Sequence, residues 1–126
     1  MYALPVEFNK SEDVKGGVRR WELSLYVDRH FDSNVPFRQL LVFITESVRS
    51  QGIDADLLLP DYDPWEDFVE GTLKIQSLEI CVYFEYSLSY LSLIAEQLEG
   101  LQIVEACTHG KVFRHEGNGL PDDVQS

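Results

Sequence analysis

The pattern of apolar and polar positions changes period between residues 18 and 52. Over residues 18–27 alternate side chains form one apolar face, and this period of two is typical of a half-buried β-strand. From residue 33 onward apolar side chains recur at the spacing of an amphipathic helix: Phe37, Leu40, Leu41, Ile44 and Val48. Pro36 suits the first turn of this helix, Ser33 or Asn34 can cap it, and Gly52 suits its end. The sequence therefore predicts a strand followed by a helix.

More strands are predicted between residues 53 and 86. Residues 53–59 alternate apolar and acidic side chains, whereas residues 60–67 contain two prolines that disfavour regular structure. Residues 68–86 are strand-like throughout, but strands are usually about five or six residues long. We therefore expect a break near Gly71 or at residues 76–77, with strands over roughly 69–75 and 78–86.

The two ends of the chain give weaker patterns. Residues 87–100 predict a second helix that begins at Ser87 or Ser89, and residues 102–115 predict two short strands around a turn at His109-Gly110. Residues 1–17 are expected to form an N-terminal arm, in which residues 4–8 can add an edge strand and residues 9–17 have loop composition. Residues 116–126 predict a flexible tail.

This order of elements predicts a single α+β domain over residues 18–115. A helix after the first strand and another before the last strand favour a ferredoxin-like βαββαβ sandwich, an antiparallel-rich sheet with two helices packed on one face. No apolar run approaches the ~20 residues that span a bilayer, and the first residues lack the features of a secretory signal. We therefore expect a cytoplasmic protein, in which Cys81 and Cys107 are buried thiols.

Charge is segregated along the chain, whose net charge is −12. Residues 1–49 contain seven acidic and seven basic residues, whereas residues 50–110 contain twelve acidic residues and one basic residue. Such a surface argues against nucleic acid and anionic membranes as partners, because both attract positive charge. Seven of the carboxylates fall within residues 54–70, which include no lysine or arginine: Asp54, Asp56, Asp61, Asp63, Glu66, Asp67 and Glu70.

No motif for catalysis or for a cofactor is recognisable. An EF-hand loop that started at Asp61 would have Trp65, Glu66 and Thr72 where a ligand, a glycine and a glutamate are needed. Cys107 and His109 lack the second ligand pair of a structural zinc site, and no glycine-rich phosphate loop occurs. We therefore predict a protein that is not an enzyme and has no metal or cofactor. A Cys107 nucleophile activated by a histidine is the enzymatic alternative.

Two aromatic residues, Tyr62 and Trp65, lie in the proline-containing loop predicted at residues 60–67, among its carboxylates. Loops are exposed, and aromatic side chains ringed by charge are typical of hot spots in protein interfaces. Like charges held close together cost stability, so we expect the balancing positive charge to come from another molecule. The alternative for Trp65 is a structural role, in which the indole folds over the sheet as a lid on the core.

An acidic single-domain chain without an active-site motif resembles the immunity proteins of bacterial contact-dependent growth inhibition and related polymorphic toxin systems. The resemblance covers residues 18–115 and rests on size, charge segregation and element order. It implies a protein that binds and neutralises a cognate toxin domain, often a basic nuclease. The residues expected to bind this partner are Asp54, Asp56, Asp61, Tyr62, Asp63, Trp65, Glu66, Asp67 and Glu70. The alternative from another class is a small ferredoxin-like ligand-binding or regulatory domain, whose free sheet face or dimer interface holds a metabolite.

Overall fold

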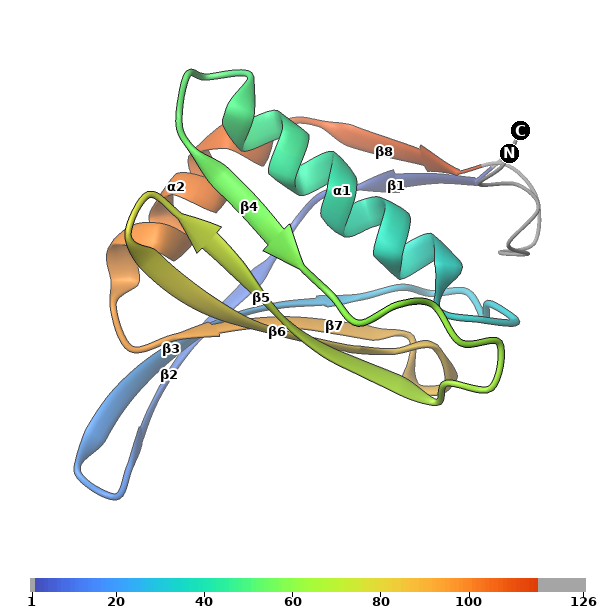
Figure 1. Ribbon diagram of the computed structural model, residues 1–126, viewed down its shortest axis with the longest axis horizontal. Coiled ribbons are helices and arrows are strands. Elements are labelled where there is room, and N and C mark those ends of the chain that lie inside the picture. Colours follow the sequence, from blue (N-terminus) through green and yellow to red (C-terminus); the bar gives the residue numbers. More distant parts are fainter. Residues whose placement is uncertain (1, 116–126) are drawn as a thin grey trace.

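The computed structural model describes residues 2–115, which form two antiparallel sheets and two helices (Figure 1). The strands are β1 (Tyr2–Pro5), β2 (Asn9–Lys15), β3 (Val18–Tyr26), β4 (Ala55–Leu58), β5 (Phe68–Ile75), β6 (Leu78–Glu85), β7 (Tyr90–Ala95) and β8 (Val112–His115). The helices are α1 (Val35–Arg49) and α2 (Leu98–Thr108), and a short 3-10 helix, η1 (Tyr86–Leu88), joins β6 to β7. Six strands form one sheet in the order β2-β3-β7-β6-β5-β4, and β1 pairs with β8 in the second sheet.

Both helices pack on the same face of the six-stranded sheet, and the core lies between them and the sheet (Figure 1). Alternate side chains of the central strands point into this core because successive residues of a strand face opposite sides. The sheet and helix α1 contribute large side chains that are almost fully buried: Leu23, Leu25, Phe37, Leu40, Leu41, Ile44, Leu73, Ile80, Phe84, Leu91 and Leu93. Each such side chain stabilises the fold by roughly 1.5–3 kcal/mol relative to an exposed position.

The first helix and the central strands form where the sequence predicts them. Helix α1 has proline in its first turn, and its apolar stripe faces the core. The hydroxyl of Ser33 accepts a hydrogen bond from the Val35 amide, 3.2 Å away, and Gly52 follows the helix end with a φ of +77°. Strands β3, β5 and β6 agree with the predicted ranges within two residues. The α+β class is therefore correct.

The prediction for residues 87–115 is wrong in two places. Residues 90–95 form strand β7 rather than a helix, because they pair with β3 on one side and β6 on the other. Residues 98–108 form helix α2, and Leu101, Val104, Cys107 and Thr108 are its buried face. The residues at 109–110 are consequently not a hairpin turn: Gly110, with a φ of +75°, follows the helix and leads into β8.

The N-terminal residues also differ from expectation. Residues 9–15, expected as loop, form the edge strand β2, which pairs with β3 across a two-residue turn at Gly16-Gly17. Both glycines have positive φ, as tight hairpin turns require. All seven β2 residues are exposed, which explains their polar composition. The ferredoxin-like plan is not confirmed, because residues 2–115 contain eight strands. The predicted tail at 116–126 lies outside the described residues.

Two smaller expectations can also be compared with the structure. Cys107 is buried in α2, but Cys81 is exposed on β6, so the expectation of two buried thiols is wrong for Cys81. Among residues 2–115 no helix is long and apolar enough to cross a membrane.

Candidate functional site

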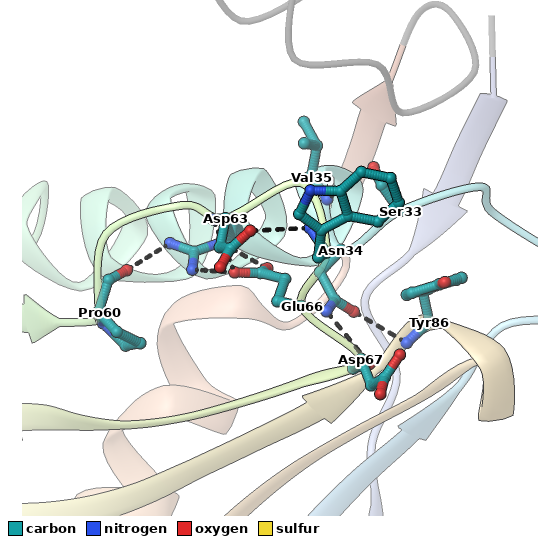
Figure 2. Close-up of polar contacts among 10 residues, drawn as sticks. Ser33, Asn34, Val35, Pro60, Asp63, Glu66, Asp67 and Tyr86 are labelled. Carbon is teal, nitrogen blue, oxygen red and sulfur yellow. Dashed lines mark hydrogen bonds and ion pairs between the residues drawn. The ribbon is translucent and has the colours of Figure 1, made fainter.

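The segment between β4 and β5, residues 59–67, is called the acidic loop, and an arginine of helix α1 holds it in place. Both oxygens of the Glu66 carboxylate accept hydrogen bonds from the guanidinium of Arg38, at 2.8 and 3.1 Å (Figure 2). Arg38 also donates to the carbonyl of Pro60 over 2.8 Å, and its guanidinium carbon lies 5.6 Å from the ring centroid of Tyr62. The side chains of Arg38 and Glu66 are only 16% and 10% exposed. Glu66 is therefore a structural residue and is not free for a partner.

A buried asparagine anchors the other end of the acidic loop. The side-chain amide of Asn34 donates to the Asp67 carbonyl over 3.3 Å, and its oxygen accepts from the Tyr86 amide over 2.9 Å (Figure 2). Within the loop, the Asp63 carboxylate accepts from the backbone amide of Trp65 over 2.9 Å, as aspartates commonly do in turns. The backbone around Trp65 is thus fixed from both sides.

The indole of Trp65 projects away from the fold. Trp65 is 89% exposed, so the alternative in which the indole folds over the core as a lid is wrong. The neighbouring carboxylates of Asp61, Asp63 and Asp67 are also exposed, and none of them forms an ion pair with another residue of the described range 2–115. The loop therefore presents a large apolar side chain beside three negative charges that remain unbalanced within the described structure.

The remaining predicted residues lie elsewhere. Asp56 is on β4 opposite Lys74 and lies 3.4 Å from the guanidinium of Arg49. The carbonyl of Asp54 accepts a hydrogen bond from Gln76, in the turn after β5, whereas the acidic loop enters β5 at its first residue. At ~3.3 Å per residue, the two ends of this eight-residue strand are about 23 Å apart. The seven carboxylates of residues 54–70 therefore do not form one surface.

A second group of residues gathers on the face of the sheet that neither helix covers, which we call the open face. Its aromatic row crosses four adjacent strands, with Tyr26 on β3, Tyr90 on β7, Tyr83 on β6 and Phe68 on β5. Neighbouring ring centroids are 4.8, 6.5 and 5.7 Å apart along this row. Glu70, the last of the predicted residues, lies on the same face opposite Tyr83.

Two further carboxylates on the open face are held by hydroxyl groups. Glu22 accepts hydrogen bonds from the Tyr90 and Ser92 hydroxyls. Glu85 accepts from the Tyr83 hydroxyl over 2.5 Å and from Ser87 over 2.9 Å. These bonds orient each carboxylate. Both bonds to Glu22 end on Oε2, which leaves Oε1 free, whereas each oxygen of Glu85 accepts one bond and retains a lone pair.

The hydrogen bonds change the protonation equilibria of these groups. The bond to Glu85, followed by burial, raises the pKa of Tyr83 to about 12. The same bond, together with that from Ser87, lowers the pKa of Glu85. Burial, and then the bond to Glu22, raises the pKa of Tyr90. At neutral pH Glu85 is therefore ionised, and both phenols are protonated hydrogen-bond donors.

Sequence reasoning missed the aromatic row for an identifiable reason. The alternation in each strand shows that Tyr26 and Phe68 face away from the core, but only the pairing of β3 with β7, β7 with β6 and β6 with β5 places them in line. The sequence contains no signal for that register beyond the outward aromatic positions themselves.

Within residues 2–115 no three histidine, cysteine, aspartate or glutamate side chains are grouped so that they could hold a metal ion. Comparisons with protein-family models, with curated protein sequences and with solved structures found no match to this chain.

Proposed function

We propose that this protein is an acidic inhibitor of the immunity type, which binds and neutralises a basic toxin domain such as a nuclease. The observation that carries the proposal is the exposed Trp65 on a loop that the fold holds in a fixed position. A tryptophan exposed in this way has no part in the core, and tryptophan is among the residues most enriched in interface hot spots. The indole is the expected apolar anchor of the complex.

The anchoring of the acidic loop favours binding for an energetic reason. Association costs about 0.5–1.5 kcal/mol for each flexible side chain that it immobilises, and ordering a mobile loop adds to this cost. Arg38 and Asn34 already fix the loop backbone in the free protein, so less of this cost arises on binding. A partner therefore meets an indole that is carried on an already ordered loop backbone.

The carboxylates beside Trp65 favour a basic partner. Asp61, Asp63 and Asp67 form no ion pair within residues 2–115, and their field attracts a positively charged surface. Complementary charge of this kind raises the association rate and makes it dependent on salt. The partner-binding residues of the proposal are thus Asp61, Asp63, Trp65 and Asp67, with Tyr62 beside them. Asp54, Asp56 and Glu66 have other contacts or lie at the far end of β5.

Native mass spectrometry of the protein purified from its source cell tests the class of partner. We expect a co-purifying basic protein in a stoichiometric complex, and a neighbouring reading frame for a large secreted protein with a variable C-terminal domain would agree with it. A bound small molecule in place of a protein would contradict the inhibitor and would favour the ligand-binding or regulatory domain.

Two variants then test the site against that partner. Trp65→Ala should weaken binding by about 2 kcal/mol or more, roughly 30-fold, because it removes the anchor. The variant D61N/D63N/D67N, whose asparagines keep the side-chain oxygens, should slow association at low salt. The control D54N/E96Q/E99Q removes the same charge at the other end of the sheet and should have a smaller effect. If the control slows association as much, or if Trp65→Ala binds as the parent does, the acidic loop is not the interface.

A further inference from the structure

The open face combines aromatic rings with oriented carboxylates at one end of the sheet. Tyr26 and Phe68, at the two ends of the aromatic row, are 65% and 51% exposed, although large apolar or aromatic side chains are usually placed in the core. Between them, Tyr83 and Tyr90 are partly buried and donate to the carboxylates of Glu85 and Glu22. No described helix or loop packs over this row, so its rings are available to another molecule.

The charge on this part of the open face is negative. Glu22, Glu70 and Glu85 surround the row, and none of them forms an ion pair within residues 2–115. Three cations lie on the same face towards the other end of the sheet: Lys15, Arg20 and Lys74. Arg20 and Lys74 are each six residues along their strands from Tyr26 and Phe68, about 20 Å away at ~3.3 Å per residue. Arg20 is two residues from Glu22, about 7 Å along β3, so Glu70 and Glu85 are the carboxylates farther from positive charge. A second copy of this chain on the row would bring like charges together, which disfavours a symmetric dimer there. The complementary occupant is a cationic surface.

Among cations, the chemistry of the row selects arginine over lysine. A guanidinium group is planar, stacks on aromatic rings and donates to a carboxylate through two parallel bonds, whereas an ammonium group is a compact charge. Ring centroids 4.8–6.5 Å apart allow one guanidinium to lie within about 6 Å of two rings. The free lone pairs of Glu22 and Glu85 are held beside those rings by the Tyr90 and Tyr83 hydroxyls.

We propose that the open face binds arginine side chains of a basic protein partner, through the aromatic row and the carboxylates of Glu22, Glu70 and Glu85. Phe68 directly follows the acidic loop in the chain, so one partner can contact the loop and the open face together. That the partner is the toxin domain rests on the proposed function, whereas the preference for arginine rests on the open face alone.

The preference can be measured without the natural partner, with synthetic octa-arginine and octa-lysine peptides as probes. Both peptides carry the same charge, so their affinity ratio isolates what the guanidinium group adds, in stacking on the rings and in paired bonds to the carboxylates. We expect octa-arginine to bind the full chain about fivefold more tightly than octa-lysine. In NMR titrations its largest shifts should fall on Tyr83, Tyr90 and Ser92. Equal affinities, or shifts centred on residues 60–67, would overturn the proposal.

Matched variants separate the two surfaces. Y26S/F68S removes the two exposed rings at the ends of the row and should abolish the preference, whereas W65S removes an exposed ring of the acidic loop and should keep it. Circular dichroism checks that each variant is folded. If Y26S/F68S is unfolded, the NMR shifts of the parent protein show whether octa-arginine binds at the aromatic row. A preference that survives in folded Y26S/F68S refutes the inference. If the arginine preference holds but no basic protein co-purifies, the proposed function fails and the inference stands. If a basic protein co-purifies but octa-arginine binds no more tightly than octa-lysine, only the inference is refuted.

Discussion

Replacing Arg38 by alanine removes the side chain that holds the acidic loop on helix α1. The variant loses two charge-assisted hydrogen bonds to Glu66 and one to the Pro60 carbonyl. Breaking a fully buried ion pair costs about 3–5 kcal/mol, whereas an exposed pair contributes about 0–1 kcal/mol. The Arg38–Glu66 pair is mostly buried, but the loop can relax and return the Glu66 carboxylate to water. We therefore expect the free energy of unfolding to fall by about 2–3 kcal/mol.

Urea unfolding followed by far-ultraviolet circular dichroism measures this loss. In thermal unfolding the same loss should lower Tm by about 8–12 °C for a chain of this size. A double-mutant cycle with Glu66→Ala should give a coupling energy above about 1 kcal/mol, because the two side chains bond directly. Arg19→Ala is the control, since the Arg19–Glu12 pair is exposed and should contribute less than about 1 kcal/mol.

The result that would refute this reasoning is an Arg38→Ala variant as stable as Arg19→Ala. The Arg38–Glu66 bonds would then contribute little, and the acidic loop would not be held in place by them. The proposed function would lose its energetic argument, because that argument depends on a loop that is ordered before the partner binds.

Two further predictions concern the sheet. A β-carbon at Gly71 would lie 2.5 Å from the Leu58 carbonyl oxygen and 2.5 Å from a methyl carbon of Leu59, so Gly71→Ala should lower the free energy of unfolding by about 1–3 kcal/mol in urea titrations. Parent-like stability would contradict this packing. The bond to Glu85, followed by burial, raises the pKa of Tyr83 from 10.0 to about 12. The stabilisation linked to the protonated phenol is therefore fully present below pH 10 and is lost as the pH rises towards 12. In an ultraviolet titration, Tyr83→Phe should lack the phenol that ionises near pH 12, and Glu85→Gln should lower the pKa of Tyr83. An unchanged titration in Glu85→Gln would show that Glu85 does not cause the raised pKa of Tyr83.

Several elements could be predicted from the sequence because their burial pattern is local. The alternation in β3 and the helical stripe of α1 each show which side chains face the core, and a period of two or of 3.6 identifies the element. The acidic loop was also predictable locally, because its two prolines disfavour regular structure at residues 60–67. The exposure of Trp65 was one of two predicted outcomes, and only the structure distinguished them.

The partners of each element were decided by the tertiary structure. Residues 90–95 have the composition of a buried helix or a buried strand, and the hydrogen bonds offered by β3 and β6 make them a strand. Glu66 is bonded by Arg38, which is 28 residues away, so a carboxylate expected to face a partner is instead part of the fold. The aromatic row of the open face likewise exists only because four strands align in one register.

One physical reason explains why the sequence predicts the elements but not the partners of each element. Periodicity along a chain shows which side of an element is buried. The buried side is formed by side chains three or four residues apart in a helix and two residues apart in a strand. It does not record which strand lies beside which, or where a distant arginine reaches, because those depend on packing between segments far apart in sequence. The sequence by itself therefore determined the acidic character of the chain and its α+β class. Tertiary packing decided which carboxylates remain free at the surface and which aromatic rings lie beside them.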